Sequence, residues 1–161
     1  MVDSRLLLIS RDDILDVADS KDGANLFRLL ARLTRQGFHL LSTAPQPDRW
    51  TREHGGPDDA LLGPDSIRKR LLDAGGVLDG VYYVPKSSWT QRRNREQALH
   101  DIVDRYATTP GNCYLISSSK KFVRVAVSEG INVIILDRHS SLISELKNLA
   151  QQSDSSKSAA D

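Results

Sequence analysis

The chain has 161 residues, 39% of them hydrophobic and 27% charged, which fits one folded domain of ordinary composition. Its formal net charge is +1, so no overall field attracts it to nucleic acid or to a membrane surface. Cys113 is the only cysteine, which excludes an internal disulfide and a cysteine-rich metal site. No apolar run approaches the roughly 20 residues of a membrane helix, and residues 6–9 are too few for a signal-peptide core. We therefore expect a cytoplasmic protein.

Segments with the patterns of strands and helices alternate along the chain. Short apolar runs predict, in chain order, strands at residues 6–9, 38–42, 80–84, 113–116 and 133–136. Apolar residues at helical spacing predict helices at residues 25–35, 65–75, 96–106, 120–129 and 140–150. Candidate helix N-caps are Asp65 and either Ser140 or Ser141, and natural helix stops are Gly37 and Gly130.

Strands that alternate with helices of this length predict β-α-β units and a parallel sheet. Right-handed crossovers then place helices on both faces of the sheet. The expected fold is an α/β, Rossmann-like three-layer sandwich of about five parallel strands, in one domain of residues 1–152. Residues 45–64 form a loop rich in Pro, Gly and Asp. Residues 153–161 contain no large apolar side chain, so we predict a disordered tail there.

Polar residues follow four of the predicted strands. Because ligands bind outside the carboxyl ends of strands in open α/β sheets, these residues mark the expected functional edge. They are, strand by strand, Ser10 to Asp13, then Ser42 and Thr43, then Lys86, Arg92, Arg93 and Arg95, and finally Ser117 to Lys121. Together they predict a polar rim with net positive charge above an apolar sheet.

The first of these segments resembles the first motif of the haloacid dehalogenase (HAD) phosphatase superfamily, a hydrophobic strand followed by Asp-x-Asp-Gly. The matching positions here are held by Ser10, Asp12 and Asp13. The resemblance extends roughly over residues 5–137 and is closest to the subgroup of histidinol phosphatases and heptose bisphosphate phosphatases. It implies a HAD-like fold with a minimal cap.

The second and third motifs of the superfamily contact phosphate. Thr43 matches the Thr that ends the second motif, which implies a phosphate contact for this residue. The third motif is an Arg-Lys-Pro-Lys-Pro-Gly run before a helix, and Arg92 and Arg93 keep only its positive charge. Lys86 is the alternative phosphate contact. The zinc loop of the subgroup is shortened here and lacks its cysteines, so we predict no zinc.

The fourth motif is a strand followed by Gly-Asp-Ser and a further Asp three positions on. Ser118 stands at the first of these acids and Phe122 at the second. In the superfamily these acids help to hold the Mg²⁺ that neutralises the phosphoryl charge. The resemblance therefore implies that the metal ligands are lost, while Lys120 beside them is a candidate anion contact.

The first motif of the superfamily supplies a nucleophilic carboxylate and, two residues on, a general acid/base. Ser10 stands at the nucleophile position, with a neutral hydroxyl and no evident base to activate it, so we expect it to be inert. Asp12 is either a relic or a remaining acid/base. We expect no metal or other cofactor; if an ion binds, it is Mg²⁺ at Asp12 and Asp13.

The main hypothesis is a catalytically inactive pseudophosphatase that binds a phosphorylated ligand, an anion or a partner protein. The alternative is an active Mg²⁺-dependent phosphomonoester hydrolase that acts on a small sugar phosphate, with Asp12 or Asp13 as nucleophile. A purely structural interaction domain also stays open. For Arg92, Arg93 and Lys120, the alternative interpretation is an ordinary solvated helix surface. Nucleic-acid binding is least favoured and predicts steep salt dependence.

Overall fold

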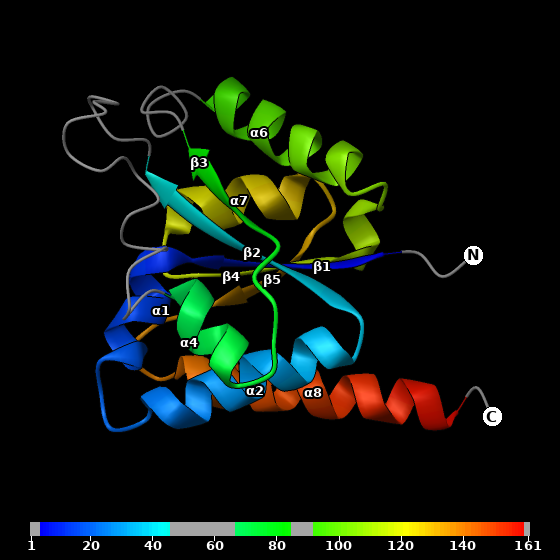
Figure 1. Cartoon of the computed structure of the whole chain (residues 1–161). Helices are drawn as coiled ribbons and strands as arrows, with labels where there is room; N and C mark the ends of the chain where they lie inside the picture. Colours follow the sequence, from blue (N-terminus) through cyan, green and yellow to red (C-terminus); the bar gives the residue numbers. More distant parts are fainter. Residues whose placement is uncertain (1–3, 46–66, 85–91, 160–161) are drawn as a thin grey trace.

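The computed structural model describes residues 4–45, 67–84 and 92–159 (Figure 1). Its strands are β1 (Arg5–Ser10), β2 (Phe38–Pro45), β3 (Gly80–Val84), β4 (Cys113–Ser117) and β5 (Asn132–Ile135). Its helices are α1 (Arg11–Ala18), α2 (Gly23–Arg35), α4 (Ile67–Asp73), α6 (Arg92–Arg105), α7 (Lys120–Ser128) and α8 (Leu142–Ser158), with a short 3-10 helix, η2 (Pro110–Asn112). No helix in these three ranges is long and apolar enough to cross a membrane.

The strands form one all-parallel sheet in the order β3-β2-β1-β4-β5. The strand β1 is central, which explains its unbroken apolar run: both of its faces and both of its edges are covered. Each residue from Leu6 to Ile9 is at most 1% exposed. The predicted parallel sheet of about five strands is confirmed.

Helices cover both faces of the sheet, with α6 and α7 on one side and α1, α2, α4 and α8 on the other (Figure 1). The alternation of side chains along β1 divides the core accordingly. Leu7 and Ile9 pack among the buried residues of α1, α2 and α8, whereas Leu6 and Leu8 pack among those of α6 and α7. This confirms the three-layer α/β sandwich.

One helix was not predicted from the sequence, and another begins earlier than predicted. The polar residues that follow the first predicted strand form the start of α1, where Asp12 and Asp13 interact favourably with the positive end of the helix dipole. Ile14 and Ala18 are the buried residues of this helix. The helix α6 begins at Arg92 rather than at residue 96, so the arginine cluster is helical.

The last helix corrects the prediction of a disordered tail. The helix α8 continues to Ser158, and only residues 160–161 of the tail lie outside the described part. Ser153 is 4% exposed, and its hydroxyl accepts a hydrogen bond of 3.2 Å from Arg5. Asp154 is bonded to Arg32 and, at 2.5 Å, to the side-chain amide of Gln36. Polar tertiary contacts therefore order a segment that lacks large apolar side chains.

Polar contacts also account for the ends of α8. Of the two predicted caps, Ser141 is the N-cap and accepts a hydrogen bond of 3.1 Å from the backbone of Ser144. The hydrogen bond from Arg32 is the main cause that lowers the pKa of Asp154 below its ordinary value. Pro45, the first residue of the loop predicted at 45–64, ends β2. The rest of that loop and the predicted cap Asp65 lie outside the described residues.

Candidate functional site

The predicted polar rim begins with residues at the carboxyl ends of three adjacent strands. Ser10 ends β1 and stands in register with Thr43 of β2. On the other side of β1, Ile9 stands in register with Ile116, which places Ser117 and the turn before α7 beside the start of α1. The structure thus brings the first, second and fourth predicted segments to one edge of the sheet.

A carboxylate crosses this edge. Asp13, in the first turn of α1, accepts two hydrogen bonds from Ser118, in the turn between β4 and α7. The Ser118 hydroxyl donates to Oδ1 at 2.8 Å, and the Ser118 backbone N–H donates to Oδ2 at 3.2 Å. Both oxygens of Asp13 are therefore engaged by a residue 105 positions away in the sequence.

Local sequence alone favours a different contact for Asp13. Ser10 is the N-cap of α1, and a Ser followed three residues later by an acid has the spacing of a capping box. Ser10, however, makes no side-chain capping hydrogen bond. The carboxylate of Asp13 is instead directed to Ser118, so the tertiary contact prevails over the local one.

Asp12 is oriented differently from Asp13. Its side chain is 66% exposed, and its Oδ1 lies 3.6 Å from Nε of the neighbouring Arg11. The carboxylates of Asp12 and Asp13 therefore do not converge on one point. Asp12 lies beside the partly buried side chain of Arg11, and Asp13 is bonded to Ser118.

The turn before α7 and the first turn of this helix are rich in donors and cations. Lys120 and Lys121 are exposed, and neither forms an ion pair with another of the described residues. Ser119 is the N-cap but makes no side-chain capping bond. Since cations at a helix N-terminus oppose the helix dipole, these lysines do not stabilise α7.

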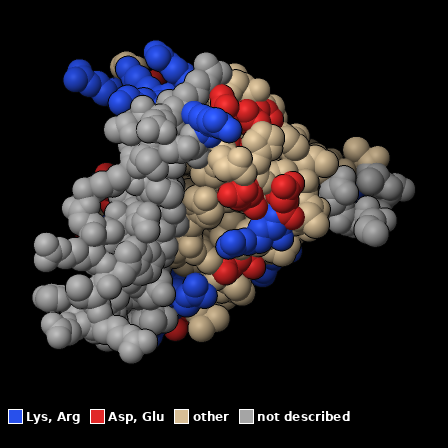
Figure 2. Space-filling view, turned by 90° about the horizontal axis from the view of Figure 1, so that it is seen from above, with Lys and Arg blue, Asp and Glu red and all other residues tan. Residues whose placement is uncertain are grey.

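The remaining predicted contacts come from α6 and from the segment before it. Arg93 is exposed in the first turn of α6, and Arg92 begins that helix. Lys86 lies outside the described residues. Viewed from the side of α6, positive and negative side chains are interspersed, and several positive ones gather at one corner (Figure 2). On this face, positive charge is therefore concentrated at one corner.

Phe122 occupies the position of the last acid in the resembled motif. It is 4% exposed and belongs to the core cluster between the sheet and helices α6 and α7. Among the described residues, no group of three or more His, Cys, Asp or Glu side chains could hold a metal ion.

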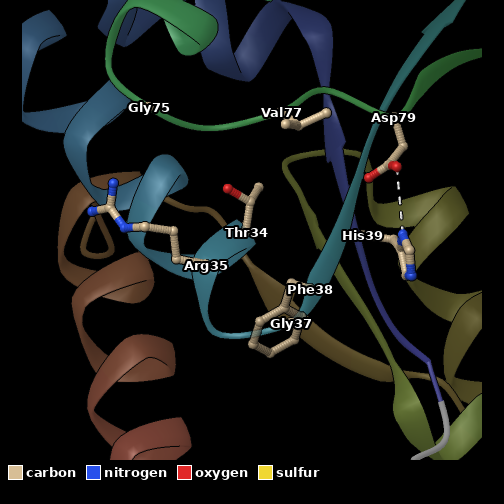
Figure 3. A pocket seen from close by; sticks show the side chains of 8 residues that line it. All are labelled: Thr34, Arg35, Gly37, Phe38, His39, Gly75, Val77 and Asp79. Atoms are coloured by element: carbon tan, nitrogen blue, oxygen red, sulfur yellow. Dashed lines mark hydrogen bonds and ion pairs between the residues drawn. The ribbon is translucent and has the colours of Figure 1, made fainter.

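The opposite edge of the sheet has a feature that sequence reasoning missed. An open cavity of about 350 Å³ lies near the amino end of β2, between the end of α2 and the segment before β3 (Figure 3). On one side of it, His39 Nδ1 lies 3.4 Å from Asp79 Oδ1, and Asp79 Oδ2 accepts a hydrogen bond from the backbone of Leu40. The proximity of His39 and Asp79 could have been predicted if the second and third strands had been identified as neighbours.

Cys113 is excluded as a nucleophile by its surroundings. It is fully buried at the start of β4, and burial raises the pKa of its thiol to about 11. The nucleophilic form is the thiolate, which the raised pKa disfavours at neutral pH.

An all-parallel five-stranded sheet in this order, between two layers of helices and with polar residues at its carboxyl edge, defines a HAD-like α/β fold. No protein-family model matches the chain, and no curated protein matches it.

Solved structures do match. An uncharacterized protein from Corynebacterium glutamicum is 21% identical with a TM-score of 0.58, covering 92% of this chain and 96% of that chain. The D,D-heptose 1,7-bisphosphate phosphatase from B. bronchiseptica, complexed with magnesium and phosphate, is 14% identical with a TM-score of 0.61, covering 92% and 99%. The HAD family enzyme bt-2542 from Bacteroides thetaiotaomicron is 9% identical with a TM-score of 0.51, covering 88% and 97%. The chain is thus structurally similar to HAD-family enzymes.

Proposed function

We infer that this protein binds a phosphorylated small molecule, or another anion of that kind, at the carboxyl edge of the sheet and does not transfer the phosphoryl group. The observation that carries the proposal is the distribution of charge at the start of α7. Lys120 and Lys121 are exposed there without a recorded ion pair in the described ranges, whereas the nearby carboxylate of Asp13 is bonded to Ser118. An anion at this turn would meet two cations and the positive end of a helix.

The residues at the edge do not suit the phosphoryl transfer of the resembled enzymes. Ser10 offers a neutral hydroxyl where those enzymes have a nucleophilic carboxylate, and a serine becomes nucleophilic only beside an activating base. Each such loss typically costs several kcal/mol of transition-state stabilisation.

The same residues do not fit a Mg²⁺ ion held as in those enzymes. Mg²⁺ requires oxygen ligands, preferably carboxylates, in near-octahedral geometry. Asp12 lies beside Arg11, Asp13 is bonded to Ser118, and Phe122 brings an apolar ring to the position of an acid. We therefore assign no step to a metal ion.

The second candidate function is a working phosphomonoester hydrolase with a displaced nucleophile. The observation that favours it is the 66% exposure of Asp12 at the carboxyl edge, where the carboxylate is accessible to a substrate. A fold similar to that of a heptose bisphosphate phosphatase is compatible with both candidates. An acidic protein partner would also pair with the exposed lysines.

Two assays on the same preparation test the proposal. The first is calorimetric titration with inorganic phosphate. The second is phosphate release with Mg²⁺ from a panel of sugar phosphates and a chromogenic ester, with Ser10→Asp and Asp12→Asn as comparators. We expect binding, and no turnover above the Asp12→Asn background. Mg²⁺-dependent turnover that is lost in Asp12→Asn would establish the hydrolase instead, and absence of binding would refute the anion site.

A further inference from the structure

We propose that Asp13 is an internal competitor for this anion site: its carboxylate occupies donors that a bound phosphate would use, and the ligand must displace it. The proposal rests on the function inferred above and adds a means of regulating the same site. It follows from the two hydrogen bonds that join Asp13 to the N–H and the hydroxyl of Ser118.

The donors at Ser118 are of the kind that phosphate groups bind. A backbone N–H beside a hydroxyl, at the turn that leads into a helix, is a typical arrangement for accepting an oxyanion. Asp13 presents two carboxylate oxygens to these two donors, much as a phosphate presents two of its oxygens. Since hydrogen bonds with an ionised partner are stronger than neutral ones, the carboxylate is an effective occupant.

The position of Asp13 supports displacement rather than permanent closure. Asp13 lies in the first turn of α1 and is only partly buried, and both hydrogen bonds are solvent-exposed. When a ligand arrives, the carboxylate can turn toward the N-terminal end of its own helix, where the capping-box spacing to Ser10 and the helix dipole favour a negative charge. The released carboxylate therefore has an alternative favourable position at the N-terminus of α1.

The resembled motif has glycine at this position, which cannot supply a competing carboxylate. In this chain the acid is thus added at the edge where the first and fourth motifs lose acids, at Ser10 and Ser118. The acid at this edge therefore has a different role: Asp13 can occupy the donors of the anion site, whereas the acids of the resembled motifs hold a metal ion.

The test compares Asp13→Asn with wild type by calorimetric titration with inorganic phosphate. The matched control is Asp16→Asn, which removes the same charge from the exposed side of the same helix and leaves Ser118 untouched. We expect Asp13→Asn to bind phosphate about tenfold more tightly than wild type, since one charge-assisted contact no longer has to be broken. We expect Asp16→Asn to stay within about twofold.

The outcomes separate this proposal from the inferred function. If wild type binds phosphate and Asp13→Asn binds no more tightly, Asp13 is a structural tie and the proposal is refuted, while the anion site stands. If neither protein binds phosphate, the anion site and its competitor both fail. Should Asp13→Asn not fold, the Ser118 amide signal of wild type decides: it must shift on phosphate addition if Asp13 is displaced, and an unchanged signal in a protein that binds phosphate refutes displacement.

Discussion

The two edges of the sheet use charged side chains in different ways. At the amino edge, polar groups are bonded to one another: Arg5 reaches the backbone carbonyl of Gln36 and the hydroxyl of Ser153, and His39 pairs with Asp79. At the carboxyl edge, Asp13 of α1 is bonded to Ser118 in the turn before α7. The lysines at the start of α7 form no ion pair with the other described residues. The polar contacts at the amino edge join helices to the sheet, whereas the lysines at the carboxyl edge are accessible to an anion.

This difference follows the general behaviour of open α/β sheets. Loops at the carboxyl ends of parallel strands carry the functional groups, and the opposite ends contribute stability. The cavity of about 350 Å³ near His39 lies at the amino edge, away from the Asp13–Ser118 contact. The proposed anion site is therefore at the carboxyl edge, and this cavity is not part of it.

The largest effect is expected when an acid is placed at position 122, where the resembled motif has one. Phe122→Asp places a charge at a site that is 4% exposed and removes an aromatic side chain from the core. We expect a loss of more than about 4 kcal/mol in the free energy of unfolding, measured by urea titration. Phe122→Leu, the matched control, keeps the apolar volume and should cost about 1 kcal/mol. A folded Phe122→Asp of near wild-type stability would contradict the assignment of this position to the core.

A smaller effect is expected at the amino edge. Arg5→Ala removes the contacts with Gln36 and Ser153, and also the stacking of the guanidinium 4.3 Å from the centre of the Phe38 ring. We expect a loss of about 1 to 3 kcal/mol in urea titration. Lys121→Ala, at the carboxyl edge, should stay within about 0.5 kcal/mol of wild type. Equal losses for both variants would remove the distinction between the two edges.

A charge reversal at the start of α7 should separate stability from binding. Lys120→Glu replaces a cation that opposes the helix dipole by an anion that complements it. We expect a gain of about 0.5 kcal/mol in urea titration together with weaker phosphate binding in calorimetry. A loss of stability with unchanged binding would show that Lys120 serves the fold.

The smallest effect is a pH dependence at the end of α8. The hydrogen bonds from Arg32 and Gln36 lower the pKa of Asp154 in the folded protein below its ordinary value of 3.8. Its contribution is therefore complete above pH 3.8 and is lost as the pH falls through the lowered pKa. The difference in urea midpoint between wild type and Asp154→Asn should accordingly be present at neutral pH and shrink on acidification. A difference that grows with acid would contradict this sign.

The layers of the fold could be predicted from the sequence because they depend on patterns of apolar residues. The run at residues 6–9 predicted a strand, which the structure places at the centre of the sheet. The strand at Gly80–Val84 has the bounds that were expected. The end of α8 could not be predicted in this way, since Ser153 and Asp154 are ordered by Arg5, Arg32 and Gln36, which are distant in the sequence.

The candidate site was predictable in its location and not in its contacts. The rule for parallel sheets placed the segments that hold Ser10, Thr43 and Ser118 at one edge, and the structure brings them there. The bond between Asp13 and Ser118 depends on side-chain directions that spacing does not reveal. The roles of Arg92, Arg93 and Lys86 stay predictions.

The most direct test of the inferred function is a titration of the isotope-labelled protein with inorganic phosphate, followed by the backbone amide signals. If phosphate binds at the carboxyl edge, the signals of Ser10 to Asp13, Thr43 and Ser117 to Lys121 shift together, and those of Gly37, His39 and Gly75 at the opposite edge do not. Shifts confined to the residues around the amino-edge cavity, or no shifts at all, would contradict an anion site at the carboxyl edge.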